Sequence, residues 1–558
     1  MSNRLSTDAL PAHPIVRDRL HGRLPPDEAE LVAGSLRRWY AATCVAVVGV
    51  ALCLRFFHLG TQSLWIDEIN VTRLARSGHV LSAVRDLDGP FEPPLHFLVV
   101  LAALKLPVGL ESAARVPAAL FGTLEVLGLI LLAREATGWR LVVIIAGGLL
   151  AVAPFAVRYS QENRYYTMFS ALHLFTWWLL LRAVRTRTLR SWLVYGAVAA
   201  AMILTHPFAP IVLLVQAGAV LVAVLRARAR RREVARALVA GYAKGALLTI
   251  ALILPWYAYG AVSWIRDAGQ GNGFGLNPPG TITVPIGVGL FKGTAEWLLG
   301  NAPVVTPLIA TLLVGVIAGP FMCRGRSRLV AICSVAYVLG FVLVLVPLAR
   351  TLGTYFAFRR IEVLVAPLLL VVALTIVGTA DRLRSARVGR GTVFALVAAA
   401  TTVVLALSGV ATAKYYRSEK TNYRAFAEAV RTAPENGLVV VGPVDPRWLP
   451  SIERYLEWRR VTTPVTFIVA GARLPRLPVP AGGVLWLTGA SPGVPGLQTR
   501  ALNELGRMQV ISGVIHSPQP TNYVLPWFAS ISHPTTQSEL NRQRDRIARL
   551  PGILMASA

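Results

Sequence analysis

The chain has 558 residues, of which 54% are hydrophobic and 15% are charged. Soluble domains carry about 25% charged residues, so this composition excludes an ordinary soluble protein and indicates an integral membrane protein. The formal net charge of +28 could suggest a nucleic-acid-binding protein. The arginines, however, cluster in short runs between apolar segments, which is typical of cytoplasmic anchors of membrane helices, so no nucleic-acid partner is expected.

Eleven apolar segments follow a polar N-terminal tail at residues 1–39 and are predicted to cross the membrane. A spanning helix needs roughly 20 apolar residues for a hydrocarbon core about 30 Å thick. The first segment is not followed by a small-residue cleavage site, so we interpret it as a retained signal anchor. The predicted spans are residues 40–58, 114–133, 141–157, 165–181, 191–208, 210–225, 237–257, 304–322, 329–348, 361–380 and 392–412.

Arginine runs predict the side of the membrane on which each loop lies. Four runs separate apolar segments, at residues 182–190, 226–236, 324–328 and 382–390, and further arginines lie in the N-terminal tail. By the positive-inside rule all of these face the cytoplasm. The N-terminus is then cytoplasmic and the C-terminus extracytoplasmic. The outer loops, which carry the polar residues of chemical interest, are residues 59–113, 158–166, 258–303 and 350–360.

The apolar segment at residues 93–104 decides whether this topology holds. It offers only about 13 residues, or ~20 Å of helix. If it crossed the membrane, every later arginine run would fall outside. Its length and the charge bias therefore both predict that it lies in the membrane interface.

The tail at residues 413–558 has a different pattern. Its ~145 residues are enough to bury a core, and we predict a small extracytoplasmic α/β domain. The predicted fold class is therefore a polytopic α-helical membrane protein with about 11 transmembrane helices at residues 40–412. The tail alternates helix-like stretches at residues 422–433, 447–458 and 537–549 with strand-like runs at residues 438–441, 466–469, 484–487 and 508–511.

Asp67 and Glu68 are the most informative polar residues of the chain. They follow the first span in the predicted outer loop 59–113, beside Trp65, which suits an interfacial anchor. A carboxylate at the membrane surface can accept a proton from an attacking hydroxyl. With two adjacent carboxylates, one can act as the base while the other orients the acceptor or binds a metal. The alternative interpretation is a solvated loop charge or a helix N-cap.

The second outer loop is rich in charged and aromatic residues, including Arg158, Glu162, Arg164 and Tyr165. We expect Glu162 to pair with Asp67 around one reacting centre, the alternative being a salt-bridged loop cap. A metal site would need three or more carboxylate or imidazole ligands at suitable spacing. The sequence has no compact motif of this kind, so no cofactor is predicted and a divalent metal ion stays open.

Basic residues on the predicted outer face are unexpected under the positive-inside rule, so their presence there suggests a function. Tyr355, Arg359 and Arg360 form the clearest cluster, and Lys292 is a second candidate. A guanidinium group matches phosphate oxygens, so we expect these residues to bind a lipid-linked phosphate. The alternative is contact with lipid headgroups or with a carboxylate.

Further candidates for substrate binding lie at the edges of the outer loops. Glu92 and His96 flank the Pro93-Pro94 corner, and Arg164 and Tyr165 belong to the second outer loop. We group all four with the substrate-binding residues, although His96 could equally be a residue of a helix start.

Taken together, these residues resemble the GT-C superfamily of glycosyltransferases, in the branch of the protein O-mannosyltransferases and the lipid A aminoarabinose transferase. The acidic pair of the first outer loop is the specific part of the resemblance, which covers roughly residues 40–440. The other matching positions are Pro93-Pro94-Leu95, Arg115, Arg158 to Tyr166, Arg359-Arg360 with Pro367, and the stretch Lys420 to Phe426.

This resemblance implies transfer of one sugar from a polyprenyl phosphate to an acceptor outside the cytoplasm, with inversion. Asp67 would be the general base, Glu68 would orient the acceptor, and Arg158, with the basic residues named above, would hold the phosphate. The acceptor would be a cell-envelope polysaccharide, a glycolipid or a protein. The sugar stays open among mannose, arabinofuranose and other monosaccharides.

Two alternatives remain for a multi-pass protein of the plasma membrane. A lipid-linked glycan polymerase or ligase would use a diphosphate donor and transfer a whole glycan. A transporter or flippase would be expected to show repeated halves and polar residues at mid-membrane depth. The spans show no obvious repeat, and the polar residues gather at the predicted outer surface, which favours the enzyme.

Overall fold

The chain forms two compact units in the computed structural model. The helical unit comprises Met1–Arg55, Ala119–Ser160 and Tyr165–Thr412, and the loop unit comprises Phe56–Ala118, Gln161–Arg164 and Ala413–Ala558. The structure describes residues 26–88, 92–229, 231–269, 305–351, 362–417, 423–431, 438–444, 449–469, 484–490, 511–515 and 525–531.

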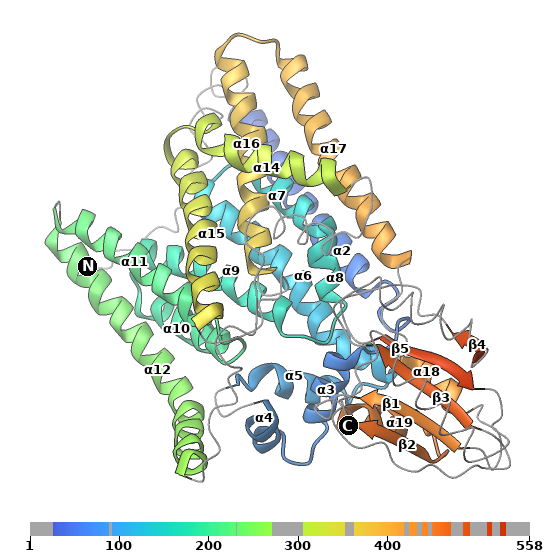
Figure 1. Cartoon of the computed structure of the whole chain (residues 1–558). Coiled ribbons are helices and arrows are strands. Elements are labelled where there is room, and N and C mark those ends of the chain that lie inside the picture. The colour runs from blue at the N-terminus through green and yellow to red at the C-terminus, as the bar shows by residue number, and fades with distance from the viewer. Residues whose placement is uncertain are drawn as a thin grey trace. The chain divides into compact units, whose positions relative to one another are not determined.

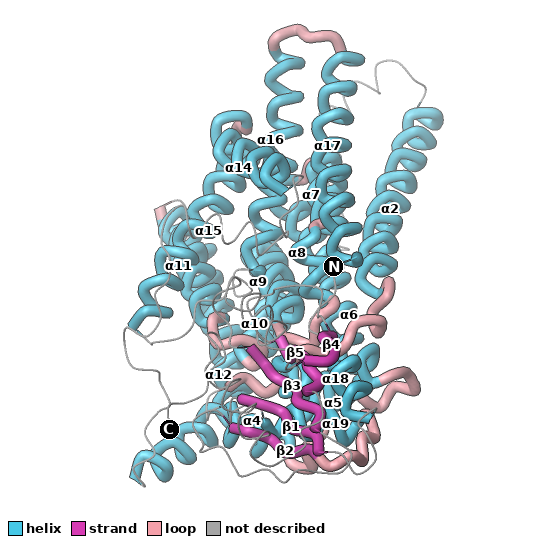
Figure 2. Tube along the Cα trace, turned by 45° about the vertical axis from the view of Figure 1, so that its right-hand side comes forward, coloured by secondary structure: helices cyan, strands magenta, loops and turns pink. Residues whose placement is uncertain are grey.

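The helical unit consists of long apolar helices, which run through Figures 1 and 2 as the largest part of the chain. Long apolar runs favour helices in a bilayer because only a helix or a closed barrel satisfies every backbone polar group there. The first turns of α6, up to Ala118, belong to the loop unit. The elements are α2 (Pro26–Phe56), α6 (Leu110–Thr137), α7 (Arg140–Val152), α8 (Pro154–Ser160), α9 (Tyr166–Thr186), α10 (Leu189–Ile203), α11 (Ala209–Arg228), α12 (Arg232–Gly269), α14 (Val305–Met322), α15 (Gly325–Thr351), α16 (Val365–Ser385) and α17 (Arg390–Arg417).

Among the described residues, eight helices are long and apolar enough to cross a membrane. A ninth span is formed if α7 and α8, which meet at a 56° bend, cross as one. Two further apolar helices, Leu189–Ile203 and Ala310–Met322, are shorter. Each of the eleven predicted segments overlaps one of these helices. The mostly helical membrane fold is thus confirmed, whereas eleven crossings and the side on which each terminus lies stay predictions.

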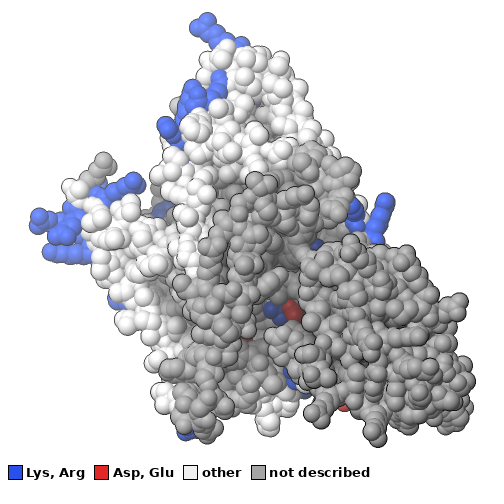
Figure 3. Space-filling view, viewed as in Figure 1, with Lys and Arg blue, Asp and Glu red and all other residues white. Residues whose placement is uncertain are grey.

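The core of the helical unit is built around α7 and α16, whose buried faces are aliphatic. Elsewhere, α10 and α12 approach closely where Gly196 faces Gly245. The approach is so close that a side chain at Gly196 would collide with the Gly245 carbonyl oxygen. Small residues of this kind let membrane helices pack backbone to backbone. In Figure 3 the Lys and Arg side chains gather at helix ends, beside the α16–α17 turn at the top and the α11–α12 turn at the left.

The loop unit begins with three short helices after α2. They are α3 (Ile66–Ala75), α4 (Val80–Asp88) and α5 (Leu95–Ala103). The nine residues of α5 make a helix of only about 14 Å, well short of the roughly 30 Å that a span requires. This length supports the prediction that residues 93–104 do not cross the membrane.

The described part of the tail contains two helices and a five-stranded mixed sheet, with the strand order β2-β1-β3-β5-β4 (Figure 2). β1 pairs in parallel with β2 and β3, while β5 pairs antiparallel with β3 and β4. The helix predicted at residues 537–549 lies outside the described residues. The elements are α18 (Tyr423–Arg431), β1 (Leu438–Val444), α19 (Leu449–Trp458), β2 (Val465–Val469), β3 (Val484–Ala490), β4 (Ile511–Ile515) and β5 (Leu525–Ile531).

The two tail helices share a hydrophobic core with the first outer loop. Tyr423 of α18 and Ile452 and Tyr455 of α19 are buried in one cluster with Leu64 and Trp65, which precede α3. The start of α3 is therefore packed against residues more than 350 positions later in the sequence, and this packing positions the site described next.

Candidate active site around the first outer loop

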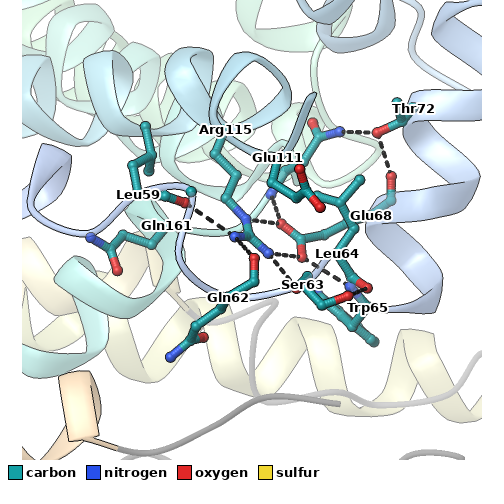
Figure 4. A network of polar contacts seen from close by, with 12 residues as sticks. Leu59, Gln62, Ser63, Leu64, Trp65, Glu68, Thr72, Glu111, Arg115 and Gln161 are labelled. Atoms are coloured by element: carbon teal, nitrogen blue, oxygen red, sulfur yellow. Dashed lines mark hydrogen bonds and ion pairs between the residues drawn. The ribbon is translucent and has the colours of Figure 1, made fainter. Parts of the chain in front are cut away.

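Glu68 lies in the first turn of α3 and is completely buried. Its Oε1 accepts hydrogen bonds from Arg115 Nε and the Asn163 backbone N–H, each at 2.7 Å. Its Oε2 accepts from Arg115 Nη2 at 2.6 Å and from the Trp65 backbone N–H at 3.2 Å. A carboxylate has about four lone-pair positions, and these four donors occupy them (Figure 4).

The bond from the Trp65 backbone explains why α3 begins where it does. Glu68 is the third residue of the helix, where a carboxylate can reach back to an unpaired N–H at the helix start. Asp67 and Glu68 also place two negative charges at the positive end of the helix dipole. Asp67 and Glu68 thus both favour the start of the helix, and Glu68 also forms an ion pair with Arg115 of α6.

Arg115 lies near the start of α6 and is buried, and it organises the chain before α3. Besides its two bonds to Glu68, it donates to the carbonyl oxygens of Leu59 at 3.1 Å, Gln62 at 2.7 Å and Ser63 at 2.8 Å. A guanidinium group offers five N–H donors in a fixed fork. Figure 4 shows this fork directed at the loop on one side and at Glu68 on the other.

The short segment Gln161–Arg164 ties the second outer loop to α3 and α5. The Asn163 backbone donates to Glu68, and its side-chain amide donates to Thr72 Oγ1 at 3.0 Å. The neighbouring residue Arg164 lies within electrostatic range of His96, a buried residue of α5. Burial, followed by the positive charge of Arg164, lowers the pKa of His96 to about 3.

Asp67 is the second residue of α3 and is 8% exposed, unlike the fully enclosed Glu68. The Tyr423 side chain of α18 is within its electrostatic range. Burial raises the pKa of the Tyr423 hydroxyl, and the negative charge of Asp67 raises it further. The Tyr423 hydroxyl therefore stays neutral within electrostatic range of Asp67, whose side chain retains slight exposure to solvent.

The structure brings half of the predicted site residues into the loop unit. Glu162, 4% exposed, is adjacent to the Asn163 amide that contacts Glu68. Arg158 and Tyr165 belong to the helical unit, where Tyr165 stacks edge-on against His206. The residues in the loop unit are Asp67, Glu68, Glu92, His96, Glu162 and Arg164. Those outside the described residues are Lys292, Tyr355, Arg359 and Arg360.

Two buried arginines have no role among the sequence predictions. Arg115 is only a matching position of the family resemblance, and Arg55 is absent from the predicted site. Both are fully buried within apolar helices, and Arg55 donates to the carbonyl oxygens of Ala151 and Leu150 at 2.9 Å and 3.3 Å. An ionisable residue inside an apolar span is itself a signal of a structural or functional site. That signal is present in the sequence for both residues.

A metal-binding group is not found within the part of the chain that the structure describes. There, no three or more His, Cys, Asp or Glu side chains come together in a way that could hold a metal ion. The two oxygens of Glu68, the most enclosed carboxylate of the site, are instead held by donors of the protein itself.

Comparison with known proteins gives a sequence match and a similar fold. Residues 91–259 match the family described as dolichyl-phosphate-mannose-protein mannosyltransferase. No curated protein matches the chain significantly. The matched residues include His96, Arg115 and Glu162, and they begin after the acidic pair.

The solved structures that are similar to this chain include two glycosyltransferases from different organisms. The archaeal oligosaccharyltransferase AglB from Archaeoglobus fulgidus, in complex with an inhibitory peptide and a dolichol-phosphate, has a TM-score of 0.50 and 13% sequence identity. That match covers 75% of this chain and 64% of AglB, so the chain spans somewhat less than two thirds of that protein. ArnT from Cupriavidus metallidurans in the apo state has a TM-score of 0.49 and 17% identity, covering 89% of this chain and 98% of ArnT.

Proposed function

We propose that this chain, a glycosyltransferase whose sequence and fold resemble those of the GT-C enzymes, transfers a single sugar from a polyprenyl phosphate to a cell-envelope acceptor. The acceptor is a polysaccharide, a glycolipid or a protein on the extracytoplasmic face of the plasma membrane. The family match at residues 91–259 supports a lipid-monophosphate donor, because the family is described by such a donor.

The observation that carries the proposal is that Glu68 is completely enclosed by the protein, whereas the adjacent Asp67 retains slight exposure. Glu68 accepts four hydrogen bonds from the protein and has no acceptor position left for a substrate hydroxyl. Asp67, on the same helical turn, keeps 8% exposure. Asp67 is therefore our general base, and Glu68 acts through α3 by fixing the position of Asp67 instead of contacting the acceptor.

The chemical step is one displacement at the anomeric carbon. Asp67 takes the proton of the acceptor hydroxyl as the hydroxyl oxygen attacks, and the bond from the anomeric carbon to the phosphate oxygen breaks on the opposite face. The configuration inverts, and the electron pair leaves with the lipid phosphate. Phosphate is already a good leaving group, so the step needs no general acid.

Positive charge must stabilise the departing phosphate. Arg158 and Arg164, on either side of the Glu162 segment, are our candidates among the described residues. Lys292, Tyr355, Arg359 and Arg360 are proposed for the same task from the sequence. Glu162, Tyr165, His96 and Glu92 are proposed to line the substrate-binding site.

An assay with purified protein tests the donor class. The full chain is incubated with polyprenyl-monophosphate sugars in one series and with polyprenyl-diphosphate glycans in another, each with envelope acceptors. Transfer from a monophosphate sugar is the expected result. Turnover only with the diphosphate glycans would replace the proposal by a polymerase or ligase.

Asp67→Asn tests the base. General-base catalysis contributes typically 10²- to 10⁴-fold, so we expect transfer to fall by roughly that factor while the polyprenyl-phosphate sugar still binds. Asp381→Asn, at an exposed position near the end of α16, is the matched control and should keep full activity. Undiminished transfer by Asp67→Asn would remove Asp67 as the base.

A further inference from the structure

Two arginines, from distant parts of the sequence, together hold the loop that precedes α3. Arg115 donates to the carbonyl oxygens of Leu59, Gln62 and Ser63. Arg424 of α18 donates from Nη2 to the Gly60 carbonyl and from Nη1 to the Thr61 carbonyl, each at 3.2 Å. Every backbone carbonyl from residue 59 to residue 63 thus accepts a bond from one of these two side chains.

Each arginine is fixed in turn by a glutamate. Arg115 is paired with Glu68, and Arg424 Nη2 lies 3.1 Å from Glu111 Oε1. Glu111 and Arg115 are both on α6, four residues apart, so they share one face of the helix. The first turns of α6 therefore supply one member of each ion pair, and α3 and α18 supply the others.

Ser63 adds a third connection between this loop and the tail helices. Its Oγ accepts a bond from the Arg424 backbone N–H at 3.1 Å and lies 3.2 Å from the Tyr455 hydroxyl. Tyr455, which is fully buried on α19, also donates to Glu111 Oε1 at 3.3 Å. Burial raises the pKa of Tyr455, which keeps its hydroxyl protonated as a donor.

We propose that Arg424 is a positioning residue of the glycosyl transfer, through which the tail helices hold loop 59–63 and thereby set the position of Asp67. This rests on the proposed function. The tail would then be an integral part of the site and more than an accessory to it. α18 strengthens this view because its Tyr423, adjacent to Arg424, is within electrostatic range of Asp67.

The alternative is that Arg424 only adds stability to the tail. A positioning role should lower kcat while leaving KM for the donor nearly unchanged, because the donor's phosphate is held by other residues. Misplacement of a catalytic group by about 1 Å can cost on the order of 100-fold in rate. A purely stabilising residue would lower the amount of folded enzyme without changing the kcat of what remains.

The test uses the full chain in lipid nanodiscs and compares Arg424→Met, Arg424→Lys and Arg454→Met. Arg454 is the matched control, since it forms an ion pair with Glu457 of the same helix and both side chains are more than half exposed. For Arg424→Met we expect kcat per folded molecule to fall roughly 10- to 100-fold, with KM for the polyprenyl-phosphate sugar within about twofold. Arg424→Lys should recover part of this loss, because lysine keeps the charge but not the fork.

Amide hydrogen exchange over residues 59–65 supplies a readout that is independent of turnover. Faster exchange in this loop for Arg424→Met, with Arg454→Met unchanged, supports the positioning role even where Arg424→Met is too unstable for kinetics. Equal exchange and equal kcat for the two variants would overturn it. If the wild type turns over no monophosphate donor, the proposed function fails, and the exchange result still decides whether Arg424 holds the loop.

Discussion

Arg55 of the helical unit and Arg115 of the loop unit are both fully buried, yet their partners differ in kind. Arg55 donates to backbone carbonyls, those of Ala51, Leu150 and Ala151. Arg115 donates to three carbonyls and also to both oxygens of Glu68. The carboxyl groups of Glu125 and Glu362 lie within electrostatic range of Arg55.

This difference separates two uses of a buried cation. Two of the carbonyls that Arg55 binds, those of Leu150 and Ala151, lie in the last turn of α7, just before the bend to α8. Arg55 therefore joins two membrane helices at a helix C-terminus, where a cation is favourable. Arg115 binds carbonyls of the turns that precede α3, and its carboxylate partner Glu68 lies next to Asp67 in the first turn of that helix. The first arginine stabilises helix packing, whereas the second determines a local conformation next to the proposed base.

The largest expected effect comes from replacing Arg115, and a separate variant at Arg55 serves as the comparison. Arg115→Met frees loop 59–63 and leaves Glu68 buried without its partner, which costs about 3–5 kcal/mol of stability. We expect kcat per folded molecule to fall by 100-fold or more, by roughly the rate cost of displacing a catalytic group by 1 Å. Steady-state kinetics on protein normalised for its folded fraction give the measurement.

Arg55→Met is the comparison for this variant. It removes buried hydrogen bonds from a charged donor, at about 1.5–3 kcal/mol each, and should lower the unfolding midpoint while kcat stays within about twofold. If Arg55→Met lowered kcat as much as Arg115→Met does, the proposed separation between packing and catalytic positioning would be wrong.

The helices of the fold were largely predictable, because a bilayer requires long apolar segments and these are visible in hydropathy alone. The strands were less so. Three strand-like runs coincide with β1, β2 and β3, whereas the run at 508–511 lies mostly before β4 (Ile511–Ile515). β5 was missed, although it pairs with two neighbours, because Pro526 lies within it and proline argues against a strand.

The acidic pair was visible in the sequence, but the state of Glu68 was not. Its partners Arg115 and Asn163 lie 47 and 95 residues away, and no local pattern connects them. Arg424 is farther still, more than 360 residues from the carbonyls that it binds. Spacing can indicate which residue types suit a reaction, whereas only the folded arrangement shows that both oxygens of Glu68 already accept hydrogen bonds from the protein.

A smaller effect should come from neutralising the two glutamates that fix the arginines. Glu68→Gln removes the charge from a fully buried pair and should lower the free energy of unfolding by about 3 kcal/mol, with kcat lowered roughly 10-fold. Glu111→Gln should cost about 1 kcal/mol or less, because its partners Arg424 and Arg459 are 37% and 29% exposed. Unfolding in denaturant, monitored by circular dichroism, gives the free energy of unfolding of both variants. A larger loss for Glu111→Gln than for Glu68→Gln would contradict the role assigned to burial.

The last effect is confined to mildly acidic pH and concerns His96, a buried group of the loop unit. Burial and Arg164 lower its pKa to about 3, from the ordinary value of about 6.5. Between these values the unfolded chain binds a proton that the native protein does not, so stability falls as pH falls below about 6.5. From pH 6.5 to 5 this single group should cost up to about 2 kcal/mol, at about 1.4 kcal/mol per unit.

His96→Gln should flatten the pH dependence of the unfolding free energy in that window, whereas His79→Gln, at an exposed position, should leave it as in the wild type. Parallel slopes for the wild type and His96→Gln would show that His96 is already protonated in the native protein, which would require a nearby negative charge strong enough to offset both burial and Arg164.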